Sequence, residues 1–396
     1  MKALAYALEA CLIALLVPVS RALRFCGYSS DGIAIVGWWG SETVGDIAIL
    51  GQLLIECREV DPDARLTVVS FDTSVTERSL ADLGNPDVAI ESLGIRSAWT
   101  MAMSRCVIVG GGPLMESPSM IAWSWRLRLA YAAGARTLCY ANGIGPVRSR
   151  RTARAIAALA RASTHIVLRD EASRSWLTEN VPSVSSTVSF DPAFDYARSR
   201  FATISPTRKA QIALALRRPP AAYLDETDTG IATEVFLDTI ARSLNVLAES
   251  HPIELAGIVM HDGTGDSDDH AIFVALRERL AHPELLVVPA GRHSVDDTIR
   301  RIGESRAALT VRFHAMILAL ATGTPFIAVD YARPQGKVSG AAAMLGREID
   351  VLQWDQVHVD DLAERLRKMI EADPSPVPNL EAARQRRLDL LRQSLN

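Results

Sequence analysis

The chain lacks the cysteine patterns of a metal site or a disulfide framework. Its five cysteines are widely separated, and none belongs to a CxxC motif or to a cysteine–histidine pair with metal-ligand spacing. Scattered cysteines of odd number are typical of a reducing compartment. The chain also lacks a basic run interleaved with aromatic residues, and its net charge is −4. We therefore expect no nucleic-acid partner and identify no metal ligands.

Charged residues are few, at 22%, whereas hydrophobic residues make up 48% of the 396 positions. This composition is typical of a packed globular protein and excludes a largely disordered one. The chain is long for a single hydrophobic core, so we expect two domains. No repeat of fixed period is present, so two such domains share architecture only.

Only one long apolar run occurs, from Ala3 to Val19, and Glu9 interrupts it. Seventeen residues with a glutamate are short for a membrane span. The run also has features of a signal peptide, with Ser20-Arg21-Ala22 as a cleavage site that has small residues on either side of the arginine. A third interpretation, which we favour, is a helix lying on the membrane surface or on the protein itself. We expect Pro18 to end this helix within a segment spanning residues 1–30.

From residue 31 onward, short apolar strands alternate with glycine-rich turns and helices, a pattern typical of parallel sheets covered on both faces. It predicts an α/β protein with two Rossmann-like domains, at 31–200 and 208–375, a linker at Arg198–Lys209, and a C-terminal helix at 376–396. The predicted strands are Ile33–Val36, Leu66–Ser70, Cys106–Val109, Thr137–Ala141, His165–Leu168, Thr187–Ser189, Ile212–Leu216, Ile253–Val259, Leu285–Val288, Ala307–Val311 and Phe326–Val329.

Polar residues and glycines gather where the predicted strands end. In open α/β sheets the ligand lies beyond the carboxyl ends of the strands. The residues placed there are Asp46, Gly111, Gly112, Asn142, Gly143 and Arg169 in the first domain, and His261, Arg312 and His314 in the second. Glycines let backbone N–H groups approach a ligand. Simpler roles stay open, because glycine runs also form tight turns and aspartates such as Asp46 also favour the first turn of a helix.

Arg312 and His314 stand out because they lie where an apolar strand gives way to a helix. The first turn of a helix has unpaired N–H groups and a positive dipole end, which favour an anion. Arginine adds a planar fork suited to phosphate or carboxylate, and histidine moves protons near neutral pH. The pair predicts an anionic substrate handled by acid–base chemistry.

A series of motifs in this order resembles the polysaccharide pyruvyltransferase family across residues 33–337. The matching motifs are Gly37-x-x-Gly40, Gly45-Asp46-x-Ala48-Ile49-Leu50, Gly110-Gly111-Gly112-x-Leu114, Gly143-Ile144-Gly145-Pro146, Leu168-Arg169-Asp170, Asp191-Pro192-x-Phe194, and Arg312-x-His314 through Pro325 to Tyr331. The resemblance implies the two-Rossmann, glycosyltransferase-B-like architecture, with a C-terminal helix that returns to the first domain. It also implies transfer of the pyruvyl group of phosphoenolpyruvate to a sugar as a ketal, with release of phosphate, in cell-surface polysaccharide synthesis.

This resemblance assigns expected roles to particular residues. We expect Arg312 and Arg169 to bind phosphoenolpyruvate together with Lys337 or Arg333, because the family's lysine after the tyrosine is displaced here. His314 is the expected proton carrier, and Asp46 acts as a base or orders its loop. The residues assigned to the acceptor or its loops are Gly45, Gly111, Gly112, Asn142, Gly143 and His261. Phosphoenolpyruvate is a co-substrate, and no other cofactor is expected.

The acceptor and one rival function stay open. The acceptor sugar belongs to a nucleotide sugar, a lipid-linked oligosaccharide or a polymer. The rival is a glycosyltransferase of the same architecture that uses a nucleotide sugar; against it, no pair of glutamates eight residues apart follows Arg312, since the next acidic residues are Asp330 and Glu348. A non-catalytic assembly protein ranks last. We expect a cytoplasmic protein, because phosphoenolpyruvate is cytosolic, with peripheral contact at the inner face of the membrane through residues 3–19.

Overall fold

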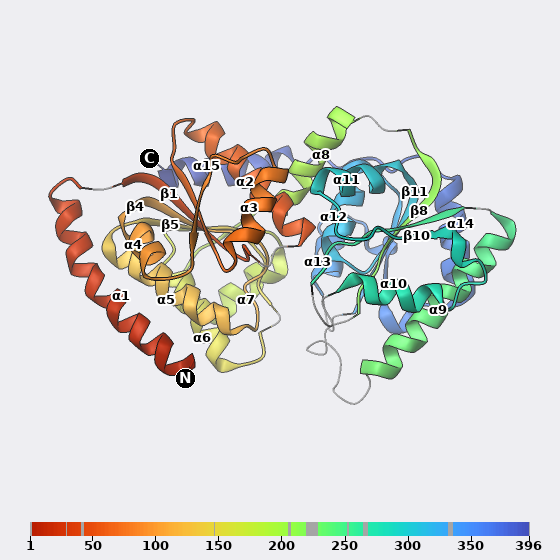
Figure 1. Ribbon diagram of the computed structural model, residues 1–396, viewed down its shortest axis with the longest axis horizontal. Coiled ribbons are helices and arrows are strands. Elements are labelled where there is room, and N and C mark those ends of the chain that lie inside the picture. The colour runs from red at the N-terminus through yellow and green to blue at the C-terminus, as the bar shows by residue number, and fades with distance from the viewer. Residues whose placement is uncertain are drawn as a thin grey trace. The chain divides into compact units, whose positions relative to one another are not determined.

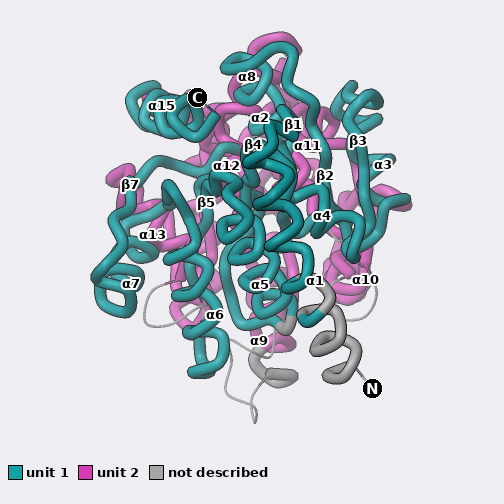
Figure 2. Tube along the Cα trace, turned by 90° about the vertical axis from the view of Figure 1, so that its left-hand side faces the viewer, with its two compact units in different colours: residues 1–42, 49–192, 380–396 teal, residues 43–48, 193–379 magenta. Residues whose placement is uncertain are grey.

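The chain forms two compact units, each built on a parallel sheet (Figure 1). This computed structural model describes residues 2–28, 30–40, 43–145, 147–204, 207–218, 229–251, 253–263, 268–331 and 336–395. Unit 1 comprises residues 1–42, 49–192 and 380–396, and unit 2 comprises residues 43–48 and 193–379 (Figure 2). The chain therefore passes between the units near residues 42, 48, 192 and 379.

The sheet of unit 1 has seven parallel strands in the order β3-β2-β1-β4-β5-β6-β7. The strands are β1 Ser30–Val36, β2 Leu66–Ser70, β3 Ala89–Ser92, β4 Ser104–Val109, β5 Arg136–Asn142, β6 His165–Leu168 and β7 Thr187–Val188. The direction of winding reverses between β1 and β4, which pair side by side with Val36 opposite Val109. Such a switch point is where open α/β sheets bind ligands.

Helices cover both faces of this sheet, because alternate residues of its strands point to opposite sides. Ala34 and Val36 pack with α4 to α7, whereas Ile33 and Ile35 pack with α2, α3 and α15. The helices are α1 Lys2–Phe25, α2 Val44–Val60, α3 Thr73–Asp82, α4 Ile95–Met103, α5 Pro118–Ala133, α6 Arg150–Arg161, α7 Glu171–Asn180 and α15 Glu381–Leu395. Helix α2 begins in unit 2 and continues into unit 1.

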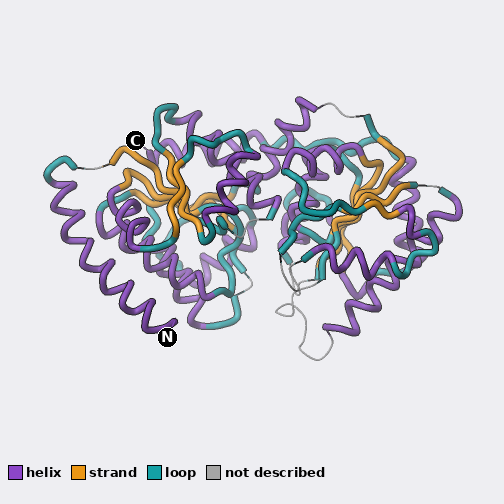
Figure 3. The backbone as a smooth tube through the Cα atoms, in the orientation of Figure 1, coloured by secondary structure: helices purple, strands orange, loops and turns teal. Residues whose placement is uncertain are grey.

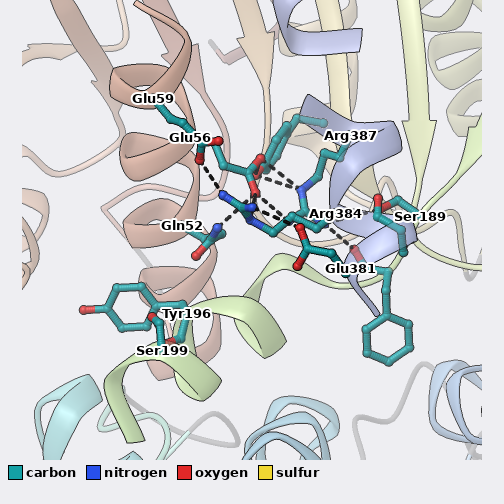
Figure 4. Close-up of polar contacts among 12 residues, drawn as sticks. Gln52, Glu56, Glu59, Ser189, Tyr196, Ser199, Glu381, Arg384 and Arg387 are labelled. Atoms are coloured by element: carbon teal, nitrogen blue, oxygen red, sulfur yellow. Dashed lines mark hydrogen bonds and ion pairs between the residues drawn. The ribbon is translucent and has the colours of Figure 1, made fainter. Parts of the chain in front are cut away.

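Helix α15 returns to unit 1 and is fixed there by a buried ion pair (Figure 4). Arg387 and Glu56, both with fully buried side chains, join α15 to α2. The Arg387 guanidinium also donates to Tyr140 Oη at 3.1 Å and to Ser189 Oγ at 3.2 Å. Tyr140 in turn donates to Glu56 at 2.7 Å. This network holds three separate segments of unit 1 on one guanidinium.

Unit 2 has six parallel strands in the order β10-β9-β8-β11-β12-β13. Figure 3 shows the strands of each unit in orange, flanked by helices in purple. The strands are β8 Lys209–Ala215, β9 Glu254–Gly257, β10 Leu286–Val287, β11 Ser305–Thr310, β12 Phe326–Asp330 and β13 Val351–Gln353. The helices are α8 Pro192–Ile204, α9 Thr229–Ser250, α10 Asp269–Arg277, α11 Val295–Glu304, α12 Phe313–Thr322, α13 Lys337–Ala343 and α14 Val359–Glu371. The switch point here lies between β8 and β11, which pair directly.

The predicted two parallel-sheet α/β domains are confirmed, as is the return of the C-terminal helix to the first of them. A linker was expected at Arg198–Lys209, and this prediction is wrong for residues 198–204. These residues form the second half of α8, whose first half buries Phe194 and Tyr196. The prediction that Pro18 ends the first helix is also wrong. Helix α1 continues to Phe25: Ser20 Oγ donates to Leu16 O across the turn that contains Pro18, and Arg24 fixes the last turn by donating to the carbonyl oxygens of Ala102 and Ser104.

Candidate functional site

The switch point of unit 2 is flanked by arginines. Arg217 follows β8, and Arg312 follows β11, the neighbouring strand. Arg217 lies over the ring of Tyr331, which follows β12, with its guanidinium carbon 6.0 Å from the ring centroid. The three residues therefore lie at the carboxyl ends of three adjacent strands. This edge of the sheet carries the positive charge that an anionic ligand needs.

Arg312 is the N-cap residue of α12 and is 8% exposed. Its guanidinium forms an ion pair with Asp269, whose side chain is 1% exposed. Burial lowers the pKa of Arg312 from its usual range, and the nearby positive charge of Arg217 acts in the same direction. Arginine nevertheless stays protonated in proteins, so a charged guanidinium lies at the first turn of α12, with the Asp269 carboxylate offsetting its charge and Arg217 adding a second positive charge nearby.

Asp269, at the start of α10, was not among the predicted site residues. Its carboxylate accepts from the backbone N–H groups of Met260 and His261, both at 3.0 Å, in addition to the Arg312 guanidinium. It thereby fixes the loop after β9 to the arginine after β11. Its place in a stretch with several other aspartates does not distinguish it in the sequence. His261 is brought to this edge through the same contact.

His314 lies in the first turn of α12, directly against the first turn of α2. A Cβ atom built on Gly45 would lie 1.9 Å from Cγ and Nδ1 of His314, so only glycine fits at this position. The backbone N–H of Val44 donates to Met260 O at 3.1 Å, which fixes this turn in place. Residues 43–48 belong to unit 2, so the Gly45-Asp46 motif and the Arg312-x-His314 motif meet within one unit.

Asp46 orders the start of α2. Its Oδ2 accepts from Thr43 N at 3.0 Å and from Thr43 Oγ1 at 2.9 Å, and the side chain is 8% exposed. This is the reciprocal contact of a helix-capping motif. The structure therefore gives Asp46 the loop-ordering role, and its role as a base stays a prediction.

Lys337, at the start of α13, lies near the middle residue of the Arg312-x-His314 motif. Its Nζ is 5.4 Å from the ring centroid of Phe313. Of the two cations considered for this region, Lys337 is thus placed beside the motif. Arg333 lies outside the described residues.

The switch point of unit 1 is aromatic. Trp38 follows β1, and its indole N–H donates to Pro113 O, beyond β4, at 3.1 Å. Its ring lies 4.9 Å from that of Trp123 and 6.4 Å from that of Phe71, which follows β2. Phe71 is 39% exposed, whereas Trp39 is completely buried in the core. Aromatic rings at a strand edge offer apolar faces to a ligand such as a sugar ring.

Arg169 is 3% exposed and lies between two carboxylates of unit 1, at 3.1 Å from Asp191 and 3.5 Å from Asp170. A Cβ atom on Gly143 would lie 2.7 Å from its Nε and Nη2, so the glycine leaves space for this guanidinium. These partners offset its charge. The expected contact of Arg169 with phosphoenolpyruvate stays a prediction.

The glycine turn after β4 and the end of β5 are tied together. Gly111 and Gly112 both have φ of 71°, the left-handed region that favours glycine. Asn142 is 1% exposed, and its amide N–H donates to Gly112 O at 3.2 Å. Ala141, beside it, adopts a φ of 51°, which is uncommon for a residue with a side chain. Of the residues assigned to the acceptor, Gly111, Gly112, Asn142 and Gly143 thus belong to unit 1, whereas Gly45 and His261 belong to unit 2.

The comparisons with known proteins match this arrangement. The sequence model described as polysaccharide pyruvyl transferase matches residues 44–333, which is most of the chain. The chain belongs to the polysaccharide pyruvyl transferase family. It is accordingly a transferase of polysaccharide biosynthesis. No curated protein matches the chain.

Solved structures share the fold at low sequence identity. The chain superposes on the UDP-GlcNAc 2-epimerase from Methanocaldococcus jannaschii with a TM-score of 0.60 at 11% identity, covering 91% of this chain and 98% of that one. For the UDP-GlcNAc 2-epimerase from Neisseria meningitidis the TM-score is 0.57 at 10% identity, covering 92% and 98%. For a glycosyltransferase from Rickettsia africae it is 0.53 at 12% identity, covering 92% and 94%. These likenesses confirm the glycosyltransferase-B-like fold class.

Proposed function

We propose that this transferase moves the pyruvyl group of phosphoenolpyruvate onto a sugar in the cytoplasm, forming a ketal and releasing phosphate. The observation that carries the proposal is the cationic switch point of unit 2, where Arg217, Arg312 and the first turn of α12 converge. Phosphoenolpyruvate carries a phosphate and a carboxylate, and both groups favour arginine forks and helix N-termini. Lys337, beside Phe313, adds a third cation.

His314 supplies the proton chemistry in this proposal. Ketal formation begins with protonation of the methylene carbon, which leaves a cationic centre at C2. One sugar hydroxyl adds to C2 and loses its proton, the bond from C2 to the phosphate oxygen breaks, and a second hydroxyl takes its place and loses its proton. A histidine in contact with the donor gives and takes these protons near neutral pH. Gly45 supports this role by letting α2 close against the His314 ring.

The acceptor sugar binds to unit 1 in this proposal. Its support is the partly exposed aromatic edge formed by Trp38 and Phe71 at the switch point, next to the glycine turn at Gly111 and Gly112. The rings offer apolar faces, and the turn offers backbone groups to sugar hydroxyls. UDP-GlcNAc is the ligand named for solved structures of the same fold, which makes a nucleotide sugar the first acceptor to test.

The proposal is tested by thermal-shift titration with phosphoenolpyruvate, compared with UDP-, GDP- and CMP-sugars. Binding to the native state raises the melting temperature by mass action. We expect a shift with phosphoenolpyruvate that Arg312→Ala abolishes and that Arg306→Ala, an exposed arginine on β11, preserves. His314→Ala should retain the shift and lose turnover. A shift only with a nucleotide sugar would replace the proposal with the glycosyltransferase alternative.

A further inference from the structure

Helix α1 carries an exposed apolar stripe. Among the side chains of α1 that the structure describes, the exposed ones recur at helical spacing and are apolar except for Arg21: Cys11, Ala14, Leu15, Pro18, Val19, Arg21, Ala22 and Phe25. Leu15 is 68% exposed and Phe25 is 94% exposed. The other side of the helix is fixed to unit 1, where Val17 packs against Ala98 and Leu129. Since the packed side holds α1 in place, the apolar stripe faces outward, and contiguous exposed apolar surface of this kind marks an interaction site.

Helix α5 lies beside α1 and exposes an aromatic and basic strip (Figure 2). Among the side chains of α5 that the structure describes, the exposed ones are Trp125, Arg128 and Tyr131. They are three residues apart, so they share one side of the helix. The Arg128 guanidinium carbon lies 5.3 Å from the centroid of the Trp125 ring. Tryptophan and tyrosine are enriched at membrane–water interfaces because their rings are apolar and their tips polar.

Helix α6 packs on α5 from the side away from α1 and exposes arginines (Figure 2). Arg150, Arg151, Arg154 and Arg161 are exposed, and the helix contains no acidic residue. At the start of α6, the carboxylate of Glu116 accepts hydrogen bonds from Arg148 N, Ser149 Oγ and Thr152 Oγ1. By contrast, arginines 365 and 367 of α14 pair with acidic residues of their own helix. In a chain of net charge −4, α6 is therefore a local concentration of positive charge.

We propose that α1, α5 and α6 together form a surface, here called the lipid face, that docks unit 1 onto a bilayer with anionic headgroups. In this arrangement the stripe of α1 enters the boundary between headgroups and acyl chains, and the arginines of α6 contact lipid phosphates. None of the described helices is long and apolar enough to cross a membrane.

A lipid surface fits these observations better than a second copy of the chain. A two-fold interface pairs the same patch with itself. In such an interface each copy would contribute the exposed arginines of α6, and α6 contains no acidic residue to pair with them. Like charges in an interface oppose association. An anionic bilayer supplies the apolar and the negative component at once. The inference concerns unit 1 alone and stands whether or not the proposed chemistry is right.

The first test is sedimentation of the full chain with vesicles in the absence of substrates. We expect binding to phosphatidylglycerol–phosphatidylcholine vesicles, weakening as salt rises, and little binding to phosphatidylcholine alone. Replacing Arg150, Arg151 and Arg154 by alanine should reduce binding on the order of a hundred-fold. A matched triple replacement of Arg242, Arg306 and Lys368, exposed on unit 2, should change it less than about two-fold, since these residues lie outside the lipid face.

The second test uses the native cysteines. Cys11 and Cys26 are exposed on α1 and just after it, whereas Cys57, Cys106 and Cys139 are buried and serve as an internal control. Anionic vesicles should slow thiol labelling of Cys11 and Cys26, and Phe25→Ser should weaken binding about ten-fold or more. Absence of binding to anionic vesicles at low salt, or undiminished binding by the triple α6 variant, would overturn the proposal. So would a dimer in solution that Phe25→Ser converts to monomer without any vesicle binding.

Discussion

The two units have the same sheet topology around their switch points but opposite chemistry there. In unit 2, the strands on either side of the switch point end in Arg217 and Arg312. In unit 1, they end in Trp38 and the turn at Gly110, and the Trp38 indole N–H reaches across to Pro113 O. The topology of an open α/β sheet thus fixes where a ligand binds, whereas the residues that follow the strands decide the chemical class of that ligand. An anion suits one edge and an apolar ring face suits the other.

Buried arginines sharpen this comparison, because burial alone does not mark a ligand site. Arg387 of unit 1 is completely buried, and its partners Glu56, Tyr140 and Ser189 lie on α2, on β5 and after β7, not after the switch-point strands β1 and β4. Arg312 of unit 2 is nearly as buried, but it caps a helix at the switch point. We therefore expect Arg387 to act in stability, whereas the proposed function gives Arg312 a role in binding the ligand. The predictions below test this assignment.

The largest expected effect is on stability, from Arg387→Met. Removal of one partner from a fully buried ion pair leaves an uncompensated charge and costs about 3–5 kcal/mol. Denaturant unfolding should show this loss, and combining the change with Glu56→Met should recover most of it. Arg392→Met, on the exposed side of the same helix, should cost at most about 1 kcal/mol. Equal losses of unfolding free energy in Arg387→Met and Arg392→Met would contradict the prediction that the buried ion pair stabilises the protein more than the surface ion pair does.

A large effect on turnover is expected from Gly45→Ala. The added Cβ would lie 1.9 Å from the His314 ring, so α2 or the ring must move. A displacement of this size at a reacting group costs on the order of a hundred-fold in rate. Gly340→Ala in α13 is the matched control, because its Cβ meets nothing within 4 Å. It should stabilise the protein by about 0.5–1 kcal/mol and leave turnover unchanged. Normal turnover by Gly45→Ala would contradict the proposed role of His314 as the proton carrier.

A moderate effect, confined to the acceptor, is expected from Phe71→Ala. Loss of a partly exposed ring removes about 1–2 kcal/mol of apolar contact with a bound sugar. The KM for the acceptor should rise about ten-fold, whereas the thermal shift with phosphoenolpyruvate should not change. Ile349→Ala, at a residue 78% exposed in unit 2, should alter neither value. A weakened phosphoenolpyruvate shift in Phe71→Ala would contradict the division of donor and acceptor between the units.

Apolar runs in the sequence predicted the central strands well. The strands Leu66–Ser70 and His165–Leu168 agree with the structure to the residue, because a buried parallel strand consists mostly of apolar residues. The edge strands Ala89–Ser92 and Val351–Gln353 were missed, since half-exposed strands need no such run. Residues 198–204 were assigned to a linker because Pro206 and polar residues follow them, although the helix buries Phe194 and Tyr196. In the missed edge strands and in α8, the secondary structure depends on packing against residues distant in the sequence.

The candidate site was predictable where its signal was local. Arg312 and His314 are two residues apart and lie at a strand–helix junction that the sequence marks clearly. Asp269, the partner of Arg312, is 43 residues away, and Glu56 is 331 residues from Arg387. A single sequence carries no information on such pairing. The same holds for Gly45, whose contact with His314 depends on how α2 and α12 meet.

The smallest expected effect is on thiol reactivity, and it reports on unit 1 alone. Burial raises the pKa of Cys139 to about 11 and that of Cys106 to about 12, and it raises the pKa of Cys57 as well. Because the thiolate is the nucleophile, a disulfide reagent at pH 8 should label Cys11 and Cys26 quickly and the other three only on unfolding. Cys57 follows Glu56 on α2, so Arg387→Met should speed its labelling by raising the population of the open state. Arg312→Ala should not, because its ion pair lies in unit 2. Faster labelling of Cys57 in both variants would show that the two buried arginines stabilise one cooperative structure, and the assignment of Arg387 to unit 1 alone would then fail.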